Sequence, residues 1–258
     1  QGSMHWISRR PEARHNPAEL LEDARTVICV AMSYYTGHPD ASCAARYAYG
    51  KDYHVVLAEK LAQMLAFLRQ ADPGLKAKSC VDTSPLAEKP LAEKAGLGWQ
   101  GRNTLLVNKY FGSWLYLGEL IINRAYAPDS PAQKGCGSCR ACIQACPTGA
   151  IRADGSLDAA RCLSSISSYD DEQPCDLHGK FMGCDICQEA CPFNRHPLSS
   201  HEKTFLEPNM LTGLTRQKLA ALSQDAYETL RKDTAFCRLP FARFRRNLIR
   251  AGLTHPDD

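Results

Sequence analysis

The stretch CGSCRACIQACP, residues 136–147, places four cysteines at the spacing C-x2-C-x2-C-x3-C-P. A shorter copy follows at Cys184, Cys187 and Cys191-Pro192, and Cys162 lies between the two copies. Cluster iron is ligated by thiolates, and in two-cluster ferredoxins the fourth cysteine of such a run ligates the other cluster. The spacing therefore predicts a ferredoxin-like unit that carries electrons through two 4Fe-4S clusters.

The eight cysteines divide into two complete ligand sets if the fourth cysteine of each run starts a short helix toward the other cluster. The first set is Cys136, Cys139, Cys142 and Cys191, and the second is Cys146, Cys162, Cys184 and Cys187. Zinc sites and disulfides are the alternatives, but zinc requires neither a Cys-Pro helix start nor a crossed allocation. Of the other cysteines, Cys29 and Cys80 fall in strand-like runs and are expected in the core. Cys175 is expected to be a structural or surface thiol.

Composition narrows the class of protein. The chain has 258 residues, is 44% hydrophobic and carries a net charge of +3, which permits an acidic partner such as RNA without arguing for one. No apolar run has the length of a transmembrane helix, and no signal peptide opens the chain. Thirteen cysteines in a chain that is neither small nor visibly secreted favour a reducing compartment. We therefore expect a cytoplasmic protein with no membrane contact.

The pattern of apolar residues predicts three regions. Residues 1–130 read as a mixed α/β unit, residues 131–196 as the cysteine-rich unit, and residues 197–258 as a helical tail. Strands are expected at 26–33, 77–81, 103–107 and 114–122, and helices at 52–69, 157–162, 215–222, 226–231 and 241–250. The repeat PLAEKPLAEK, residues 85–94, is expected to form a helix with Pro85 in its first turn and a break at Pro90. Residues 127–131 predict a linker.

One motif is rejected. GLGWQG, residues 96–101, matches G-x-G-x-x-G. The dinucleotide-binding fingerprint must follow a strand and open a helix. This motif follows a helix-like stretch and precedes the strand-like NTLLV. Its glycines are expected instead to let the backbone approach some other bulky group.

Several longer segments carry a family resemblance. They are YAYGKDYH at 47–54, VDT at 81–83, AGLGW through RNT at 95–104, FGSW through LGE at 111–119, and GCD with CQ and CP at 183–192. With these segments the chain resembles the epoxyqueuosine reductase family, whose cobalamin domain is similar to that of reductive dehalogenases. The resemblance implies an α+β protein, in which an α/β cobalamin-binding domain precedes the ferredoxin-like domain and the helical tail.

The resemblance also implies an activity. Family members reduce epoxyqueuosine to queuosine in tRNA, the last step of queuosine biosynthesis, with cobalamin and two 4Fe-4S clusters as cofactors. An external electron donor such as flavodoxin or ferredoxin and a monomeric state are implied as well. Opening an epoxide makes an oxyanion that an acid must protonate, and Asp82 matches the family's acid. The implied cobalamin contacts are Arg14, Ala45, Asp82, Asn103, Leu117, Ser164, Cys184 and Asp185, with GLGWQG in the pocket wall.

The chain also departs from the family. Members usually begin further upstream, which leaves open whether native residues, including a first strand, precede Gln1. The chain otherwise resembles the short form without C-terminal helical repeats. Asp170, Asp171 and Glu172 make the stretch after Cys162 acidic, where the family is often basic. This departure keeps two alternatives open: a cobalamin and iron–sulfur reductase of another substrate, such as an organohalide, and a non-enzymatic electron carrier.

Basic residues are the candidates for binding tRNA or cofactor groups. Phosphate contacts are expected from Arg9, Arg10, Arg243, Arg245, Arg246 and Arg250, although a basic helical face is often plain solvated surface. Arg46 and Lys89 are interpreted either as ligands of phosphate or carboxamide groups or as solvated charges.

Overall fold

A computed structural model describes residues 2–37, 43–133, 135–169, 175–206 and 215–254 of the chain. The acidic run Asp170, Asp171 and Glu172 lies outside the described residues. No helix among the described residues is both long enough and apolar enough to span a membrane.

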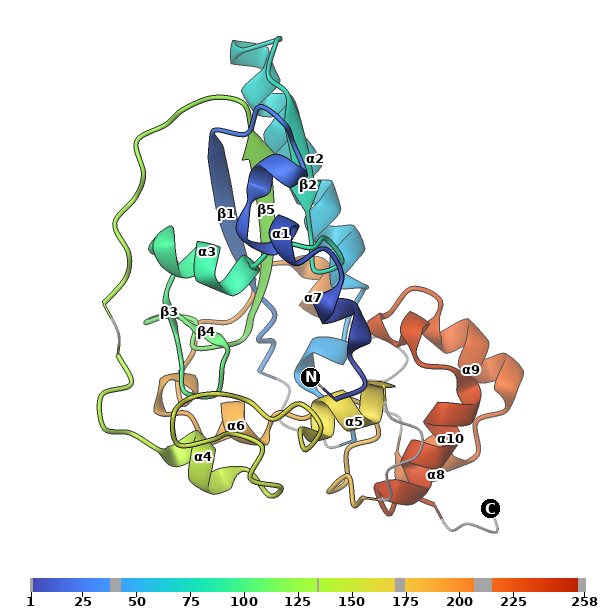
Figure 1. The fold of residues 1–258 in the computed structure, drawn as a ribbon. Helices are drawn as coiled ribbons and strands as arrows, with labels where there is room; N and C mark the ends of the chain where they lie inside the picture. The colour runs from blue at the N-terminus through green and yellow to red at the C-terminus, as the bar shows by residue number, and fades with distance from the viewer. Residues whose placement is uncertain (1, 38–42, 134, 170–174, 207–214, 255–258) are drawn as a thin grey trace.

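A three-stranded sheet forms the upper part of the molecule (Figure 1). The central strand β5 (Leu115–Ile122) pairs on one side with β1 (Thr26–Ser33) and on the other with β2 (Ala77–Cys80). These three elements confirm the strands predicted at 26–33, 77–81 and 114–122. Both pairings are antiparallel, so β1 and β2 run parallel to each other on the two sides of β5. The mixed α+β class fits, because β5 is inserted between the two strands of a β-α-β unit.

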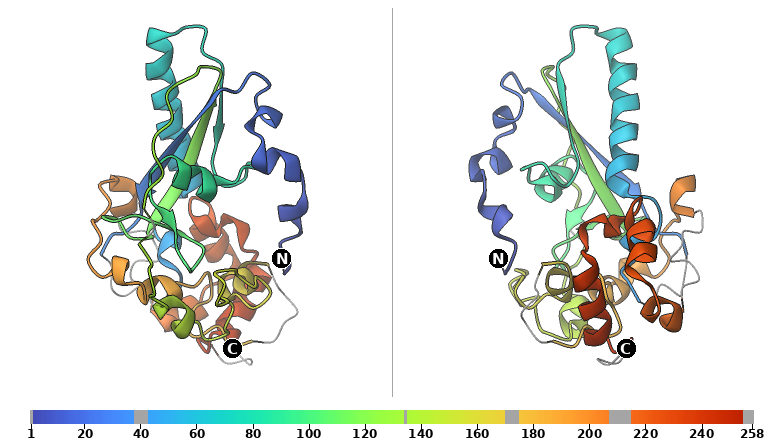
Figure 2. Two further views of the ribbon diagram at one scale, coloured as in Figure 1. Left: turned by 60° about the vertical axis from the view of Figure 1, so that its left-hand side comes forward. Right: turned by 90° about the vertical axis from the view of Figure 1, so that its right-hand side faces the viewer.

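Helices cover both faces of this sheet (Figure 2). Helix α2 (Tyr53–Ala71) begins at the predicted place, because the Asp52 side chain accepts the His54 backbone N–H at 3.0 Å. Leu57 and Leu61 of α2 pack on the side of β5 that carries Leu120 and Ile122. Ile121, on the opposite side, packs with apolar residues of α3 (Glu88–Lys94) and of the segment before β1. Covering on both faces explains why β5 reads as an almost uninterrupted apolar run.

The region around GLGWQG differs from its predicted role. Helix α3 starts at Glu88, so Pro85 lies outside it, and Pro90 falls in the first turn, where a missing N–H is tolerated. The motif then leads into a small hairpin of β3 (Trp99–Gln100) and β4 (Leu106–Val107), shorter than the strand predicted at 103–107. A Cβ on Gly98 would lie 2.3 Å from the Val107 carbonyl oxygen. Gly96 and Gly98 therefore accommodate the chain's own backbone, Gly101 accommodates the side chains of Asn103 and Val107, and none of the three lines the large cavity described below.

The cysteine-rich unit is built from short pieces of helix. They are α4 (Ala141–Ala145), α5 (Leu163–Tyr169), α6 (Ile186–Glu189) and the 3-10 helix η4 (Pro192–Asn194). Cys191-Pro192 starts η4 as predicted, whereas Cys146-Pro147 leads into a turn at Gly149, whose φ is +60°. The helix predicted at 157–162 is wrong. Asp158 forms a turn there by accepting the Ala160 N–H, and the helix starts only at Leu163.

The C-terminal region is helical, as predicted. It contains α7 (Lys203–Leu206), α8 (Arg216–Ala220), α9 (Gln224–Arg231), the 3-10 helix η5 (Ala235–Arg238) and α10 (Phe241–Arg250). Phe236, Phe244 and Leu248 enter a core that also contains Ala44 from the first region and Phe181 from the second. Ile249, by contrast, is an apolar residue of α10 that is 39% exposed.

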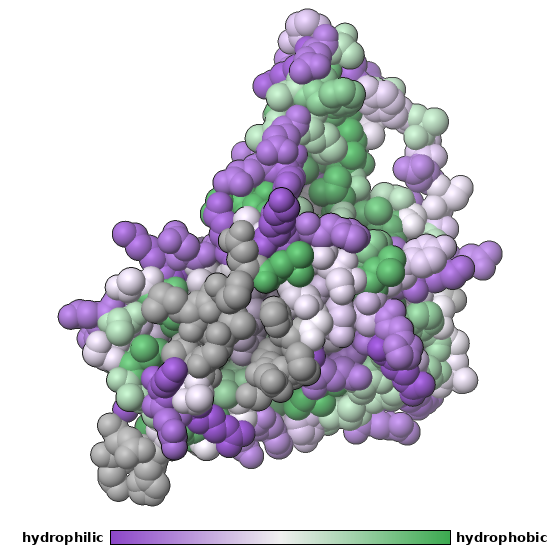
Figure 3. Space-filling model, turned by 180° about the vertical axis from the view of Figure 1, so that it is seen from behind, coloured by the Kyte–Doolittle hydropathy of each residue, from purple (hydrophilic) through white to green (hydrophobic). Residues whose placement is uncertain are grey.

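Asn247 of α10 is a polar residue but is fully buried. Its Nδ2 donates to the carbonyl oxygens of Ser167 and Phe181, which compensates for burying an amide. The remaining elements are η1 (His5–Ser8), α1 (Pro11–His15), η2 (Pro17–Glu19) and η3 (Arg46–Ala48). Seen from behind, the projecting end of the molecule shows hydrophobic surface beside hydrophilic surface (Figure 3), and Phe67 of α2 is 69% exposed.

Candidate active site

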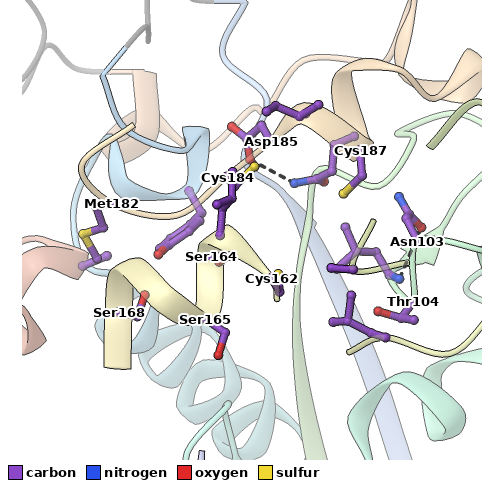
Figure 4. A pocket seen from close by; sticks show the side chains of 18 of the residues that line it. Asn103, Thr104, Cys162, Ser164, Ser165, Ser168, Met182, Cys184, Asp185 and Cys187 are labelled. Atoms are coloured by element: carbon purple, nitrogen blue, oxygen red, sulfur yellow. Dashed lines mark hydrogen bonds between the residues drawn. The ribbon is translucent and has the colours of Figure 1, made fainter. Parts of the chain in front are cut away.

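A cavity of about 500 Å³ lies where the sheet, the cysteine-rich unit and the C-terminal region meet. One side carries the serines of α5 beside Cys184 and Asp185, and Asn103 and Thr104 face them across the opening (Figure 4). The same cavity is lined by residues of β5, by Asp82 and by residues of η5. Three regions that are separate in sequence therefore contribute to one site.

The eight motif cysteines line two pockets, four in each. Cys146, Cys162, Cys184 and Cys187 all line the large cavity. Cys136, Cys139, Cys142 and Cys191 line a second, small pocket together with Arg102, Pro192 and Phe193. All thirteen cysteines of the chain are free of disulfide bonds.

The two sets are neighbours. Burial raises the pKa of Cys187 above its usual range, and Cys142 of the other set adds to this effect. The Trp99 indole donates to the Cys136 sulfur at 3.4 Å, and the Ala150 N–H donates to the Cys146 sulfur at 3.3 Å. Such donors stabilise thiolate charge in cluster sites. Each set is therefore placed as a group and supported by nearby donors.

Asp185 is held rigidly between the second cysteine set and the cavity. The residue is 1% exposed, and its Oδ2 accepts the Arg46 backbone N–H at 2.6 Å while its Oδ1 accepts the Gln188 amide at 3.1 Å. Burial raises the pKa of Asp185 to about 6. The Arg46 guanidinium, interpreted above as a ligand or a solvated charge, lies 5.3 Å from the Trp114 ring centroid.

Asp82 projects from the loop after β2 toward the cavity. Its φ is +49°, a left-handed conformation that costs a residue with a Cβ about 1–2 kcal/mol. Its Oδ2 accepts from His54 Nε2 at 3.1 Å and from Arg238 Nη1 at 3.2 Å. The side chain remains 45% exposed. Strain of this kind concentrates at functional sites, where surrounding contacts hold an unfavourable backbone in place.

His54 connects Asp82 to a second carboxylate. His54 Nδ1 lies 2.6 Å from Asp52 Oδ1, so Nδ1 carries a proton and Nε2 is the nitrogen that faces the cavity. Arg238 Nη2 lies 3.0 Å from the same Nε2, a contact that is favourable when Nε2 has lost its proton. The four side chains come from the start of α2, from the loop after β2 and from η5.

The charges of this network are set by mutual pairing. Burial alone would lower the pKa of His54, but its hydrogen bonds to Asp52 and Asp82 outweigh burial and raise the pKa to about 9. Burial alone would raise the pKa of Asp82, but His54 and Arg238 outweigh it and lower that pKa. At neutral pH, His54 is therefore an imidazolium that faces an Asp82 carboxylate, and the transferable proton resides on His54 Nε2.

The other residues implied by the resemblance divide into two groups. Asn103, Leu117, Ser164, Cys184 and Asp185 line the cavity with Asp82. Arg14 and Ala45 are not among its lining residues. The Arg14 carbonyl accepts the Ala87 N–H, and Ala45 is fully buried with its N–H donated to the Met182 carbonyl.

Several lining residues escaped the sequence analysis. Tyr34, Tyr47, Tyr53 and Tyr116 form an aromatic wall, with the rings of Tyr53 and Tyr116 stacked at 4.2 Å. Tyr47, Tyr53 and Tyr116 lay inside segments that carry the family resemblance, but nothing in those segments marked them as pocket residues, and Tyr34 lay outside them. His54 lay inside the segment YAYGKDYH, so its place beside Asp52 was a usable signal. Arg238 lay in the tail and gave none.

Comparison with known proteins places this geometry in a family. A family model described as epoxyqueuosine reductase QueG matches residues 14–83, and a model of a 4Fe-4S double cluster binding domain matches residues 135–194. The epoxyqueuosine reductase of Synechococcus sp. (strain RCC307) is 36% identical over 259 residues, which cover 98% of this chain and 80% of the relative. That of Escherichia coli (strain K12) is 34% identical and covers 96% and 69%.

Solved structures agree with these sequence matches. The epoxyqueuosine reductase of Streptococcus thermophilus superposes with a TM-score of 0.83 at 31% identity, over 94% of this chain and 68% of the other. A structure of an epoxyqueuosine reductase with an epoxyqueuosine-modified tRNA-Tyr stem loop gives 0.81 at 31% identity, over 93% and 67%. A Bacillus subtilis structure, described with its catalytic aspartate loop swung out of the active site, gives 0.83 at 31%. The chain belongs to the epoxyqueuosine reductase family.

Proposed function

We propose that this protein reduces epoxyqueuosine to queuosine in tRNA, with cobalamin as the reactive centre and two 4Fe-4S clusters as the electron path. The observation that carries the proposal is the single cavity that joins the second cysteine set to the Asp82–His54 pair. Removal of an epoxide oxygen as water, with formation of an alkene, consumes two electrons and two protons. The side of the cavity that carries the second cysteine set supplies the electrons, and the side that carries the Asp82–His54 pair supplies the protons.

The lining residues fit a corrin. A large, mostly apolar cavity with a few convergent polar groups is the usual form of a cofactor site. The buried Nδ2 of Asn103 has no hydrogen-bond partner among the described residues, so a carbonyl or amide oxygen of a bound group would satisfy it. Asn103, Ser164 and Leu117 would hold the corrin, with Cys184 and Asp185 beside it. When bound, cobalamin supplies a reduced cobalt that acts as a nucleophile or electron source toward the epoxide.

The Asp82–His54 pair delivers the two protons of this reduction: one goes to the oxyanion of the opened epoxide and, after His54 takes up a proton from solvent again, one goes to the hydroxyl group that leaves as water. Asp82 Oδ2 takes the proton from His54 Nε2 and passes it to the oxyanion of the substrate. Arg238 Nη2 then stabilises the neutral imidazole, because Nε2 has become an acceptor. Asp52 keeps the ring oriented through Nδ1. The related structure with a displaced catalytic aspartate loop supports this role for Asp82, which lies in a strained loop at the cavity.

Electrons enter at the first cluster. Cys139 is exposed, whereas the second set lies against the cavity. Arg140 is exposed beside Cys139, and Arg102 donates to the Gly137 carbonyl at 2.9 Å. This basic rim fits a small acidic electron carrier such as flavodoxin or ferredoxin, because opposite charges accelerate encounter.

tRNA is the macromolecular substrate, and the related structure with a bound tRNA stem loop supports it. Arginines expected at phosphates also contact the protein itself: Arg10 donates to the Glu19 carbonyl at 3.2 Å, Arg243 to the Ser168 carbonyl and Arg245 to the Ala220 carbonyl. We assign the phosphate contacts of the proposal to Arg9, Arg10, Arg246 and Arg250.

Anaerobic reconstitution with iron, sulfide and cobalamin tests the function. The loaded protein is expected to convert an epoxyqueuosine-modified tRNA stem loop to the queuosine form in the presence of a reductant. Absence of turnover at full iron and corrin content would refute the proposed function. Turnover of a small organohalide, with none on the stem loop, would favour the alternative reductase.

A further inference from the structure

The strained Asp82 loop is held from behind by α3. Glu88 Oε1 accepts the backbone N–H of Asp82 at 2.6 Å, where φ is +49°. This bond fixes the peptide that aims the Asp82 carboxylate at the cavity. A left-handed aspartate persists only when neighbouring groups hold it, so removal of the acceptor should release the loop.

The next residue of α3 holds a second strained loop. Lys89 Nζ donates to the Thr104 carbonyl at 2.8 Å, and Thr104 has a φ of +63°. Thr104 follows Asn103, and both residues line the cavity. Burial lowers the pKa of the Lys89 ammonium, while the charge of Glu88 partly offsets that effect. Lys89 is thus a partly buried structural donor rather than a solvated charge.

Glu88 itself rests against a second buried acid. Glu119 of β5 is 0% exposed and stands in register with Cys29 on β1 and Cys80 on β2. Glu88 is the group that its carboxyl faces, and neither Glu119 oxygen has a well-formed hydrogen bond among the described residues. A buried carboxyl without a counter-charge is expected to keep its proton.

We propose that the first turn of α3 is a clamp for both strained loops of the cavity. Glu88 positions the Asp82 loop, and Lys89 positions the Thr104 loop. Glu119 supports Glu88 by remaining protonated, so that no second buried negative charge faces the Glu88 carboxylate. These are positioning residues, because they act on the cavity through Asp82 and Thr104. The link to catalysis rests on the proposed function, whereas the clamp itself does not.

The clamp gives a definite pH dependence. Burial, with the charge of Glu88, raises the pKa of Glu119 to about 9. Burial also raises the pKa of Glu88, to about 7. The hydrogen bond from the Asp82 N–H lowers this pKa and the Asp82 charge raises it. The charges of Lys89 and His54 lower it. Between about pH 7 and pH 9, Glu88 is ionised, Glu119 is neutral and the clamp holds. Above this range, two buried carboxylates repel each other, and Glu88 should release the Asp82 N–H.

Amide hydrogen exchange at Asp82, divided by the intrinsic rate at each pH, measures the clamp without turnover. At neutral pH, Glu88→Ala should speed exchange about 10-fold or more, because the amide loses its acceptor. Glu88→Gln should keep the protection, since an amide oxygen still accepts the N–H. Glu93→Ala, on the last turn of α3, is the matched control. Unchanged exchange in Glu88→Ala would overturn the clamp, and Glu88→Leu, which also lacks an acceptor, takes its place if the alanine variant does not fold.

A second variant isolates the proton on Glu119. Wild-type protection at Asp82 should fall as the pH rises through about 9. Glu119→Gln, which mimics the neutral acid, should remove this alkaline loss. If the loss persists in Glu119→Gln, His54 rather than Glu119 controls the loop, and the role of Glu119 is refuted. The exchange data stand even if no turnover of epoxyqueuosine is found, so failure of the clamp and failure of the function are distinguishable.

Discussion

The two walls of the cavity are built in opposite ways. The cluster wall takes Cys146, Cys184 and Cys187 from two short runs whose spacing fixes their geometry locally, and it takes Cys162 from the segment between the runs. The acid wall is assembled from Asp52 and His54 at the start of α2, Asp82 after β2, and Arg238 in η5. The electron path is therefore specified by local spacing, whereas proton delivery depends on long-range packing and on a strained loop. The consequences of mutation should differ accordingly.

Loss of one cysteine should damage the cluster wall most. Cys162→Ala should reduce the iron content of the reconstituted protein from about eight to about four atoms per chain, because one 4Fe-4S cluster loses a ligand. Activity should be lost. Iron analysis and turnover check this, with Cys175→Ala as the control that keeps full iron. Full iron in Cys162→Ala would contradict the assignment of the second set.

A change in the acid wall should leave the clusters intact. His54→Gln should lower kcat about 10²-fold, within the range for a lost general acid–base group, with iron content unchanged. In the wild type, nuclear magnetic resonance of the imidazole should give a pKa of about 9. Because pairing with carboxylates raises this pKa, His54 should lose its proton at lower pH in Asp52→Asn. An imidazole pKa that Asp52→Asn does not change would break the proposed network.

A change beside the exposed Cys139 should alter only the rate at which a carrier protein reduces the clusters. Arg140→Glu should slow reduction by an acidic carrier protein about 10-fold, because encounter loses its electrostatic attraction. Reduction by dithionite should be unchanged. Arg152→Glu serves as a charge-matched control. Equal slowing with both reductants would show that Arg140 acts on the cluster and not on docking.

The smallest effect is expected at the tRNA phosphates. Arg10→Ala should weaken stem-loop binding modestly and reduce the salt dependence of the affinity by about one unit of slope, as for one lost phosphate contact. Binding titrations at several salt concentrations measure it. An unchanged slope would remove Arg10 from the interface.

The same contrast explains what could be predicted from sequence. The strands at 26–33 and 114–122, the Asp52 cap and the grouping of the cysteines all follow from local patterns. The antiparallel order of the sheet does not, because a buried strand reads the same beside either kind of neighbour. The turn at Asp158 replaced a predicted helix, since an aspartate side chain competes for backbone N–H groups. Arg238 reaches Asp82 only through packing of the tail, so no local pattern marked it.

We expect one cavity to supply both the electrons, from the cluster wall, and the protons, through Asp82. Single-turnover reduction of an epoxyqueuosine stem loop by reconstituted wild-type protein and Asp82→Asn tests it most directly. Both proteins should carry full iron and corrin and accept electrons equally. Only the wild type should form queuosine at the normal rate, with Asp82→Asn about 10²–10⁴-fold slower. Equal rates for the two proteins would contradict this expectation.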